Sequence, residues 1–415
     1  MELAFLEIVP GLRLHLRGDA LGTLFAATAG VLWLLVLPGP RRGRRYEILL
    51  ALSFVFVLGI AAAGNLLTLL VFYELLSLAA WPLIVHDETP EALAAGRRYL
   101  AYVLAGSATL LLGLGVVTMA AGDVDFGTRV EFPGAGLVLL LAGFSVKAAL
   151  LPVHGWVPRA HPVAPAPISA LLSGLMVGTG SFGMIRVIQL VDPPPLGILG
   201  GVSALTVVTA GLMAIRTDHL KRRLAWSTIS QMAYVPLALS VLHREALAGG
   251  ILHITHHAFM KGGLFLCAGL LVHHLGIRRV SEMAGVARRM PWTMGAFTLL
   301  SLGMIGIPPL SGFVSKWVMG VGMVQAGAWL PLVVLLTGAL LAALYLMPIV
   351  QTAWFDAPEG GREDDSGGAQ RTDPPPLTLV PVLVAASLTV LLGVGAAFPG
   401  FPLELARLAA RGLGG

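Results

Sequence analysis

Residues 134–157 read GAGLVLLLAGFSVKAALLPVHGWV, an apolar run with Lys147 and Pro152 inside it. About 30 Å of membrane hydrocarbon requires roughly 20 helical residues, so the run is long enough to span a bilayer. A proline interrupts the backbone hydrogen bonds of a helix, and a lysine at membrane depth requires a polar or wet surrounding. The stretch therefore predicts a discontinuous membrane helix whose break faces protein or water.

The composition extends this interpretation to the whole chain. It is 56% hydrophobic and 12% charged, with a mean hydropathy of +0.85, whereas soluble domains carry about 25% charged residues. We therefore expect a protein embedded in a lipid bilayer. The net charge of +5 lies largely in short loops, which gives no case for nucleic-acid binding. Cys267 is the only cysteine, so no disulfide, zinc ribbon or iron–sulfur motif is available, and we expect neither cofactor nor metal.

Twelve apolar runs approach the length of a membrane span. They cover residues 20–38, 47–63, 65–86, 99–121, 134–157, 165–190, 196–215, 224–242, 248–274, 292–324, 328–352 and 376–398. Alternating crossings place 17 Lys/Arg residues in the loops of one face, against Arg129 and Arg244 in those of the other. The positive-inside rule assigns the first face to the cytoplasm and both termini to the outside. The termini also carry Arg13, Arg17, Arg407 and Arg411, which weakens this asymmetry. The first run, followed by the arginines of 41–45, is interpreted as an uncleaved span.

A short internal repeat links two interrupted runs. The sequence GFSVK at 143–147 resembles GFVSK at 312–316, and the second run also carries Pro308 and Pro309. Units of five spans at 47–190 and 196–352 would be inverted relative to each other, an architecture typical of transporters. The fold prediction is an all-α polytopic protein with about 12 transmembrane helices and two inverted five-helix repeats containing discontinuous helices. Flanking these repeats are an N-terminal segment with the first span (1–46), a polar loop (353–375), and the last span with the C-terminal tail (376–415).

Lysine placement points to proton chemistry. Only four lysines occur against 23 arginines, and Lys147, Lys261 and Lys316 lie inside apolar runs, as does Glu74. Burial can make an ammonium group give up its proton, whereas a guanidinium stays charged. We predict proton-transfer roles for these four residues, with static ion pairing as the alternative. The fourth lysine, Lys221, is interpreted as an ordinary cytoplasmic loop charge.

Histidines accompany the central lysine. His253, His257 and Lys261 follow at intervals of four and form one helical stripe, with His256 rotated about 100° away from His257. Histidine changes charge near neutral pH and suits a relay. Core hydrogen bonding and a zinc site are the alternatives, although no HExxH motif is present. Nearer the loops, His154, Arg159 and His161 are candidates for a cytoplasmic entry or for an ordinary solvated loop, and Arg186 is interpreted as snorkelling to the interface.

The chain resembles the antiporter-like subunits shared by respiratory complex I, membrane-bound hydrogenases and Mrp-type cation/proton antiporters, most closely the branch that comprises the Mrp antiporters and the hydrogenases. The similarity lies in 72–76 (FYELL), 145–147 (SVK), 151–156 (LPVHGW), 161–165 (HPVAP), 168–172 (ISALL), 223–231 (RLAWSTISQ), 257–261 (HAFMK), 290–294 (MPWTM), 306–309 (GIPP) and 312–316 (GFVSK). The resemblance implies two inverted five-helix units and a proton path through Glu74, Lys147, the His257/Lys261 region and Lys316. It also implies that Glu74 and Lys147 switch protonation by electrostatic coupling.

Three departures from that family pattern stand out. Relatives commonly carry a lysine at the position of Gly178, or a histidine at that of Ser173, so a central relay residue is missing here. Arg159 replaces the usual aspartate of the loop. About two N-terminal spans of the relatives have no counterpart, and we expect them to be supplied by another subunit or lost.

The sequence thus predicts a proton-translocating subunit of a multisubunit complex in a bacterial or archaeal inner membrane. We expect other membrane subunits as partners, with the redox or cation-exchange reaction on other chains and with protons, and possibly sodium, as the transported ions. Whether the complex is an oxidoreductase of the NADH dehydrogenase or hydrogenase type or a cation/proton antiporter stays open. Two alternatives are a membrane scaffold with static charges and a self-sufficient sodium/proton antiporter.

Overall fold

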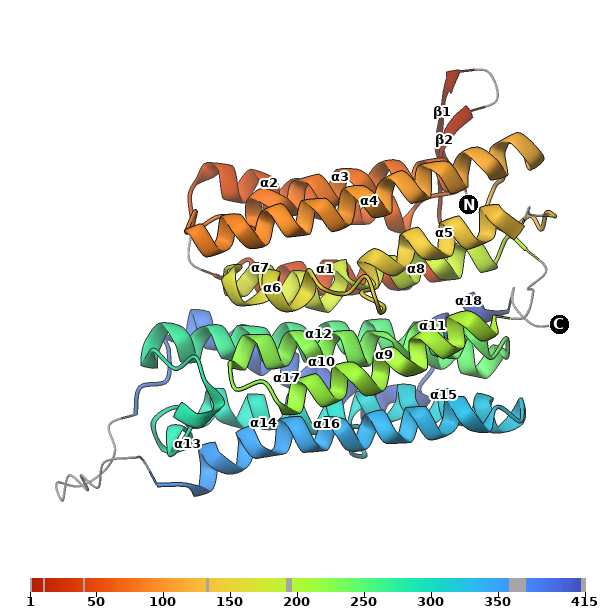
Figure 1. The fold of residues 1–415 in the computed structure, drawn as a ribbon. Helices are drawn as coiled ribbons and strands as arrows, with labels where there is room; N and C mark the ends of the chain where they lie inside the picture. The colour runs from red at the N-terminus through yellow and green to blue at the C-terminus, as the bar shows by residue number, and fades with distance from the viewer. Residues whose placement is uncertain are drawn as a thin grey trace.

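Apolar segments fold into helices that run side by side in one bundle (Figure 1). The structure is a computed structural model that describes residues 2–9, 12–39, 42–131, 134–191, 196–357 and 371–411. Both ends of the described chain lie at the same end of the bundle (Figure 1). Acidic residues predicted in the 353–375 loop, including Glu359, Glu363, Asp364 and Asp365, lie outside the described residues.

Long helices account for most of the bundle. Seven helical segments are long and apolar enough to cross a membrane by length and composition, within the part of the chain that is described: α3 (Leu66–Ile84), α4 (Pro90–Ala121), residues Ala166–Ile188, α9 (Gly197–Ile215), α12 (Arg244–Leu275), α16 (Trp329–Phe355) and α17 (Pro376–Val394) with η3 (Gly395–Ala397). Shorter helices complete the packing: α1 (Ala20–Val36), α2 (Arg44–Ala61), α5 (Gly134–Lys147), α6 (Val157–Val163), α10 (Leu220–Met232), α11 (Tyr234–Ser240), α14 (Pro291–Ile305), α15 (Ser311–Gln325) and α18 (Pro402–Ala410). Two small elements, η2 (Val280–Glu282) and α13 (Val286–Arg289), lie between α12 and α14. The polytopic helical fold is confirmed, and the number of about 12 crossings stays a prediction.

Both predicted interruptions are present. α5 ends at Lys147 and α6 begins at Val157, and α14 ends at Ile305 before α15 begins at Ser311. Two further irregularities were not anticipated. The segment Ala166–Ile188 consists of α7 (Ala166–Leu171), a π-helical turn η1 (Leu172–Met176) and α8 (Gly178–Ile188), and one residue separates α10 from α11. π-helical turns within helices are frequent at functional sites.

The N-terminus departs from the all-α expectation. Strands β1 (Glu2–Val9) and β2 (Leu12–Arg17) form an antiparallel hairpin. Residues 12–17 read LRLHLR, and this strict alternation of apolar and basic residues has the period of a strand and not of a helix.

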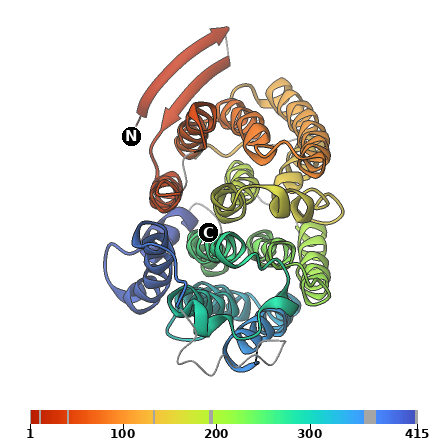
Figure 2. The same cartoon turned by 90° about the vertical axis from the view of Figure 1, so that its left-hand side faces the viewer.

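Helix α12 occupies the middle of the bundle. Almost every side chain from Ala246 to Phe265 is buried, as expected for a helix that packs on all sides. Figure 2 looks along the helices, and it shows α1 and α17, from the two ends of the chain, beside each other. Close helix packing also depends on Gly183 of α8, where any side chain would overlap the ring of Phe144 on α5.

Two basic segments predicted as loops are helical. α4 begins nine residues before the predicted span because Thr89 caps its first turn and Pro90 starts it, so Arg97 and Arg98 are exposed helical residues. Lys221, interpreted as an ordinary loop charge, is 9% exposed in α10 and donates to the carbonyl oxygen of Ala164 at 3.0 Å. That interpretation was wrong because a loop from a distant part of the chain covers it.

Candidate functional site

Glu74 lies near the middle of α3 and is half-buried. Its Oε2 accepts a hydrogen bond of 2.5 Å from Ser107 Oγ of α4. The other carboxylate oxygen, Oε1, is buried and has no hydrogen-bond partner among the described residues. A buried acceptor without a partner is costly, so this oxygen is available to a water molecule or a proton.

Lys147 is the last residue of α5, at the first break, and is 3% exposed. Its Nζ donates to Ser77 Oγ at 2.6 Å and to the carbonyl oxygen of Tyr73 at 3.3 Å, and it lies 4.0 Å from the centre of the Tyr73 ring. Tyr73 and Ser77 flank Glu74 on α3, yet no ion pair joins Glu74 to Lys147 within the described chain. The Lys147 amine and the Glu74 carboxylate are therefore neighbours that each contact a different serine, Ser77 and Ser107.

Lys261 is fully buried in the middle of α12. Its Nζ donates to the carbonyl oxygen of Leu224 at 3.1 Å and to Ser227 Oγ, both on α10. No carboxylate pairs with this amine among the described residues. Its oxygen acceptors are therefore a backbone carbonyl and a hydroxyl group of one neighbouring helix.

The predicted histidine stripe runs from Lys261 along α12. The ring centres of His257 and His253 lie 5.9 Å apart, and His253 Nδ1 lies 3.0 Å from Ser315 Oγ of α15. Both ring nitrogens of His257 and Nε2 of His253 are buried without partners in the described structure. His256, on another side of the helix, is also buried. Buried nitrogens without a protein partner are commonly hydrogen-bonded to water, so these histidines are candidates both for a water-linked relay and for core hydrogen bonding.

Lys316 lies in the second turn of α15 and is 8% exposed. Its Nζ donates to the carbonyl oxygens of Met304 and Ile305 at 2.6 and 3.0 Å. These carbonyls end α14 and are free because the break interrupts the helix, and the negative end of the α14 dipole favours a cation there. The second break thus creates the binding position of this amine.

The two lysines of the short repeat are not equivalent in the structure. Lys147 precedes its break, whereas Lys316 follows its own. The five-letter match therefore aligns two lysines with different contacts. The Lys147 amine contacts Ser77 of the neighbouring helix α3, whereas the Lys316 amine contacts the carbonyl end of α14, the other part of its own broken span. A short sequence match carries no information on which side of a break a side chain lies.

The ionisable side chains form two groups: Glu74 with Lys147, and Lys261 with the histidines of α12 and Lys316. His253 makes the printed contacts of the α12 side: its ring centre lies 5.9 Å from that of His257, and its Nδ1 lies 3.0 Å from Oγ of Ser315, the residue before Lys316. Near Lys261, Ser173 Oγ and Thr228 Oγ1 lie 2.5 Å apart, and Thr228 Oγ1 donates to the same Leu224 oxygen that Lys261 contacts. At Gly178, a Cβ atom would meet Ile254 at 3.4 Å and Met232 at 3.6 Å. Gly178, where the family resemblance led us to expect a lysine, therefore faces apolar groups.

Sequence reasoning missed the hydroxyl groups around the ionisable side chains. Ser77 contacts Lys147, Ser227 contacts Lys261, Ser107 contacts Glu74 and Ser315 contacts His253, while Ser173 and Thr228 contact each other. Serine and threonine are common in apolar helices, so their types alone gave no signal. Ser227 and Thr228 stood in a family-like segment, but nothing in the sequence paired them with Lys261.

The remaining candidates divide by burial. His154 is half-buried in the first break with its ring 5.4 Å from that of Trp226, and Arg159 is exposed. His161 is fully buried and stacks on Phe265 at 4.9 Å. Arg186 is 1% exposed and pairs with Asp19, so the snorkelling interpretation was wrong. No group of three potential metal-ligating side chains occurs within the described ranges.

The fold and the site define a class: a multi-pass helical membrane protein whose interior carries a row of ionisable side chains beside interrupted helices. The family model described as "NADH:quinone oxidoreductase/Mrp antiporter, TM" matches residues 63–342. Because that match covers more than half of the chain, the protein belongs to this family of antiporter-like membrane subunits. It is a multi-pass protein of a bacterial or archaeal cell membrane.

Individual relatives agree with this assignment. The chain is 36% identical over 376 residues to NADH-quinone oxidoreductase subunit N of Desulforudis audaxviator (strain MP104C), which covers 86% of this chain and 75% of the relative. It is 31% identical over 368 residues to hydrogenase-4 component B of Escherichia coli (strain K12), covering 80% of this chain but only 54% of that relative. A chain in the structure of the Mrp complex from Dietzia sp. DQ12-45-1b shares the fold with a TM-score of 0.89 and 24% identity, covering 98% of this chain and 85% of that one.

Proposed function

We propose that this chain translocates protons across the membrane, with Glu74, Lys147, Lys261 and Lys316 as proton-carrying groups and His253 and His257 as relay steps. The observation that carries the proposal is the support of the three buried amines. Each is held by hydroxyl or carbonyl oxygens, and none pairs with a carboxylate within the described residues. Oxygen acceptors of this kind bind both an ammonium group and a neutral amine, so proton loss breaks no ion pair.

The order of the groups follows from their contacts. Glu74 and Lys147 share the surface of α3, and a proton leaving Lys147 changes the electrostatic energy of the nearby carboxylate. Lys261, His257, His253 and Lys316 follow along α12 and α15. We place the transfer between the two groups at the Ser173 and Thr228 hydroxyls, with water completing the distance to Lys147.

We further propose that the chain works inside a multisubunit membrane complex with other membrane subunits as partners. Its relatives are named as a subunit and a component of larger assemblies, and a chain of the Mrp complex has the same fold. The sequence holds no redox motif, so an electron-transfer or cation-exchange reaction on another chain would drive the protons.

The test is Lys147→Ala in the intact complex in host membranes. Inverted vesicles are energised in turn with NADH, hydrogen and a sodium gradient, and acidification is followed with a pH-sensitive dye. Whichever driving reaction acidifies wild-type vesicles identifies the complex, and Lys147→Ala is expected to abolish that signal while native gels show unchanged assembly. Full acidification by a fully assembled variant would refute the relay.

A second candidate is a non-conducting membrane scaffold. The apolar contacts of Ile254 and Met232 at Gly178 favour it, because they remove a polar side chain from the junction between the two groups. In that case Lys147→Ala would alter assembly or stability without changing proton movement.

A further inference from the structure

A cavity of about 500 Å³ opens at the end of the bundle that carries both termini, which the arginine asymmetry predicts to be the outer face. It lies between the start of α1, the end of α8, the loop around Gly127, and α18. Its polar lining consists of Arg17, Asp19, Arg129, Arg186, Gln189 and Arg411. Four guanidinium groups thus surround one carboxylate.

The carboxylate of Asp19 already accepts hydrogen bonds through both of its oxygens. Asp19 accepts from Arg186 Nη1 at 2.5 Å, from Arg186 Nη2 at 2.9 Å and from the backbone nitrogen of Gly22 at 2.8 Å. Burial raises the pKa of the Asp19 carboxyl, but the hydrogen bonds and charge of Arg186 lower it more, so its pKa lies below the usual value and the group stays ionised. Asp19 is therefore bound directly by Arg186 and is attracted by Arg17, and the described lining of the cavity holds more guanidinium groups than carboxylates. Arg186 Nε is buried in this lining without a partner among the described residues.

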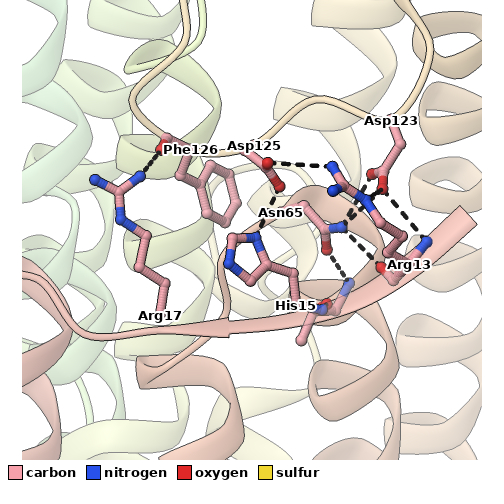
Figure 3. A network of polar contacts seen from close by, with 8 residues as sticks. Arg13, His15, Arg17, Asn65, Asp123, Asp125 and Phe126 are labelled. Atoms are coloured by element: carbon pink, nitrogen blue, oxygen red, sulfur yellow. Dashed lines mark hydrogen bonds and ion pairs between the residues drawn. The ribbon is translucent and has the colours of Figure 1, made fainter. Parts of the chain in front are cut away.

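Two other arginines of this face, Arg13 and Arg407, pair with carboxylates outside the cavity. Arg13 pairs with Asp123 and Asp125 at 3.3 and 3.2 Å, next to the contact of His15 with Asp125, as Figure 3 shows. Arg407 of α18 pairs with Glu245 at 3.0 Å. Each of these charges is balanced by a carboxylate outside the cavity.

Arg17 and Arg411 differ from them. Arg17 lies apart from the Arg13 network, where its Nη1 donates to the carbonyl oxygen of Phe126 at 2.7 Å (Figure 3). Its Nε and Nη2 have no acceptor in the described chain. Arg411 is exposed, and its side chain makes no ion pair or hydrogen bond with the described residues. Both arginines face the same cavity on the face where the positive-inside rule disfavours basic residues.

We propose that this cavity binds the phosphate group of an anionic molecule, with Arg17 and Arg411 as its principal donors. Guanidinium groups bind phosphate through paired, charge-assisted hydrogen bonds, and a phosphate group has more acceptor oxygens than a carboxylate, so it can bind several guanidinium groups at once. The cavity lies where the apolar helix α1 begins and the apolar helix α8 ends, and Leu21 and Leu408 form part of its wall. Two sources supply this chemistry at that depth: the headgroup of an anionic phospholipid and soluble phosphate.

The experiment uses the full chain purified in detergent. Native mass spectrometry measures binding of phosphatidylglycerol and of phosphatidylcholine with identical acyl chains, and thermal unfolding measures stabilisation by inorganic phosphate against chloride at equal ionic strength. The test variant is Arg17→Gln/Arg411→Gln. Arg407→Gln is the matched control, because Arg407 shares α18 with the cavity but pairs with Glu245.

We expect phosphatidylglycerol, but not phosphatidylcholine, to bind the wild type and the control. The double variant should bind it about 10-fold more weakly or worse, because two charge-assisted contacts are lost. Stabilisation by inorganic phosphate that disappears in the double variant, without a lipid preference, would support the site and assign it to a soluble anion. Binding of neither phosphate compound, or equal binding by a folded double variant, would overturn the proposal and leave the arginines to a partner subunit's carboxylate.

Discussion

Replacing Lys261 by methionine should remove proton translocation while leaving the protein stable. Methionine has nearly the length of lysine and fills the same space in α12 without a charge. The two hydrogen bonds of the buried amine, to Leu224 O and Ser227 Oγ, contribute about 1.5–3 kcal/mol each. Taking the ammonium out of water costs several kcal/mol, which offsets that gain.

The acceptors of Lys261 also keep partners when the amine is gone. Leu224 O accepts hydrogen bonds from Ser227 Oγ and Thr228 Oγ1, each at 3.0 Å, so no polar atom is orphaned. We therefore expect Lys261→Met to change the free energy of unfolding by no more than about 1–2 kcal/mol. Unfolding in mixed detergent micelles, followed by circular dichroism, measures this.

Proton movement in energised inverted vesicles supplies the second measurement. Lys261→Met should reduce acidification to background, and Lys261→Arg should do the same because a guanidinium keeps its charge. Destabilisation of Lys261→Met by more than about 3 kcal/mol would show that the amine is a structural group. Wild-type acidification with Lys261→Arg would show that this residue does not exchange protons.

Three further perturbations test the packing, the outer ion pair and the junction. Gly183→Ala places a methyl group against an aromatic ring of α5 and should destabilise by about 1–3 kcal/mol in thermal unfolding, whereas Gly201→Ala on the open side of α9 should cost nothing. The Asp19 ion pair contributes stability above its ordinary pKa of 3.8, and this contribution is lost as the pH falls through the lower pKa of the folded state. Unfolding temperatures should therefore drop below about pH 4 in the wild type, and Asp19→Asn, with Arg186 left unpaired, should be less stable at neutral pH and lack that drop. Gly178→Lys gives the new Cβ atom ordinary van der Waals contacts but puts an amine among the apolar side chains of Ile254 and Met232, so we expect a lower unfolding temperature. The folded variant should raise the rate of vesicle acidification if the missing polar group at this position limits that rate; an unchanged rate would show that the Ser173 and Thr228 hydroxyl pair suffices.

Much of the fold could be predicted because membrane insertion depends on local properties. Length and apolar character predicted helical segments, of which seven are long and apolar enough to span a membrane in the described chain. Pro152, Pro308 and Pro309 marked two breaks, but a proline alone is not sufficient, because Pro82, Pro348 and Pro381 lie inside continuous helices. The hairpin at residues 2–17 was missed because it lies before the first long apolar run, where alternation was the only signal.

The candidate site was predicted in its residues and not in its contacts. A charge inside an apolar run is expensive in any fold, so Lys147, Lys261 and Lys316 stood out from the sequence. Their partners lie on other helices, 70 residues away for Ser77 and 34 for Ser227, and a serine carries no mark of the lysine it will meet. The predicted electrostatic coupling of Glu74 with Lys147 stays a prediction, and the hydroxyl groups of Ser107 and Ser77 that contact these two side chains could not be read from the sequence.

By itself, the sequence determined that this protein lies in a membrane, that helices break after Lys147 and around Pro308, and that Lys147, Lys261 and Lys316 are buried. Each of these follows from the cost of exposing polar atoms to hydrocarbon, which a single segment incurs on its own. Only the tertiary structure decided that Lys316 binds the carbonyl end of α14, that Arg186 pairs with Asp19 from 167 residues away, and that apolar groups face Gly178. Such contacts depend on how distant helices pack, and packing is a property of the whole bundle.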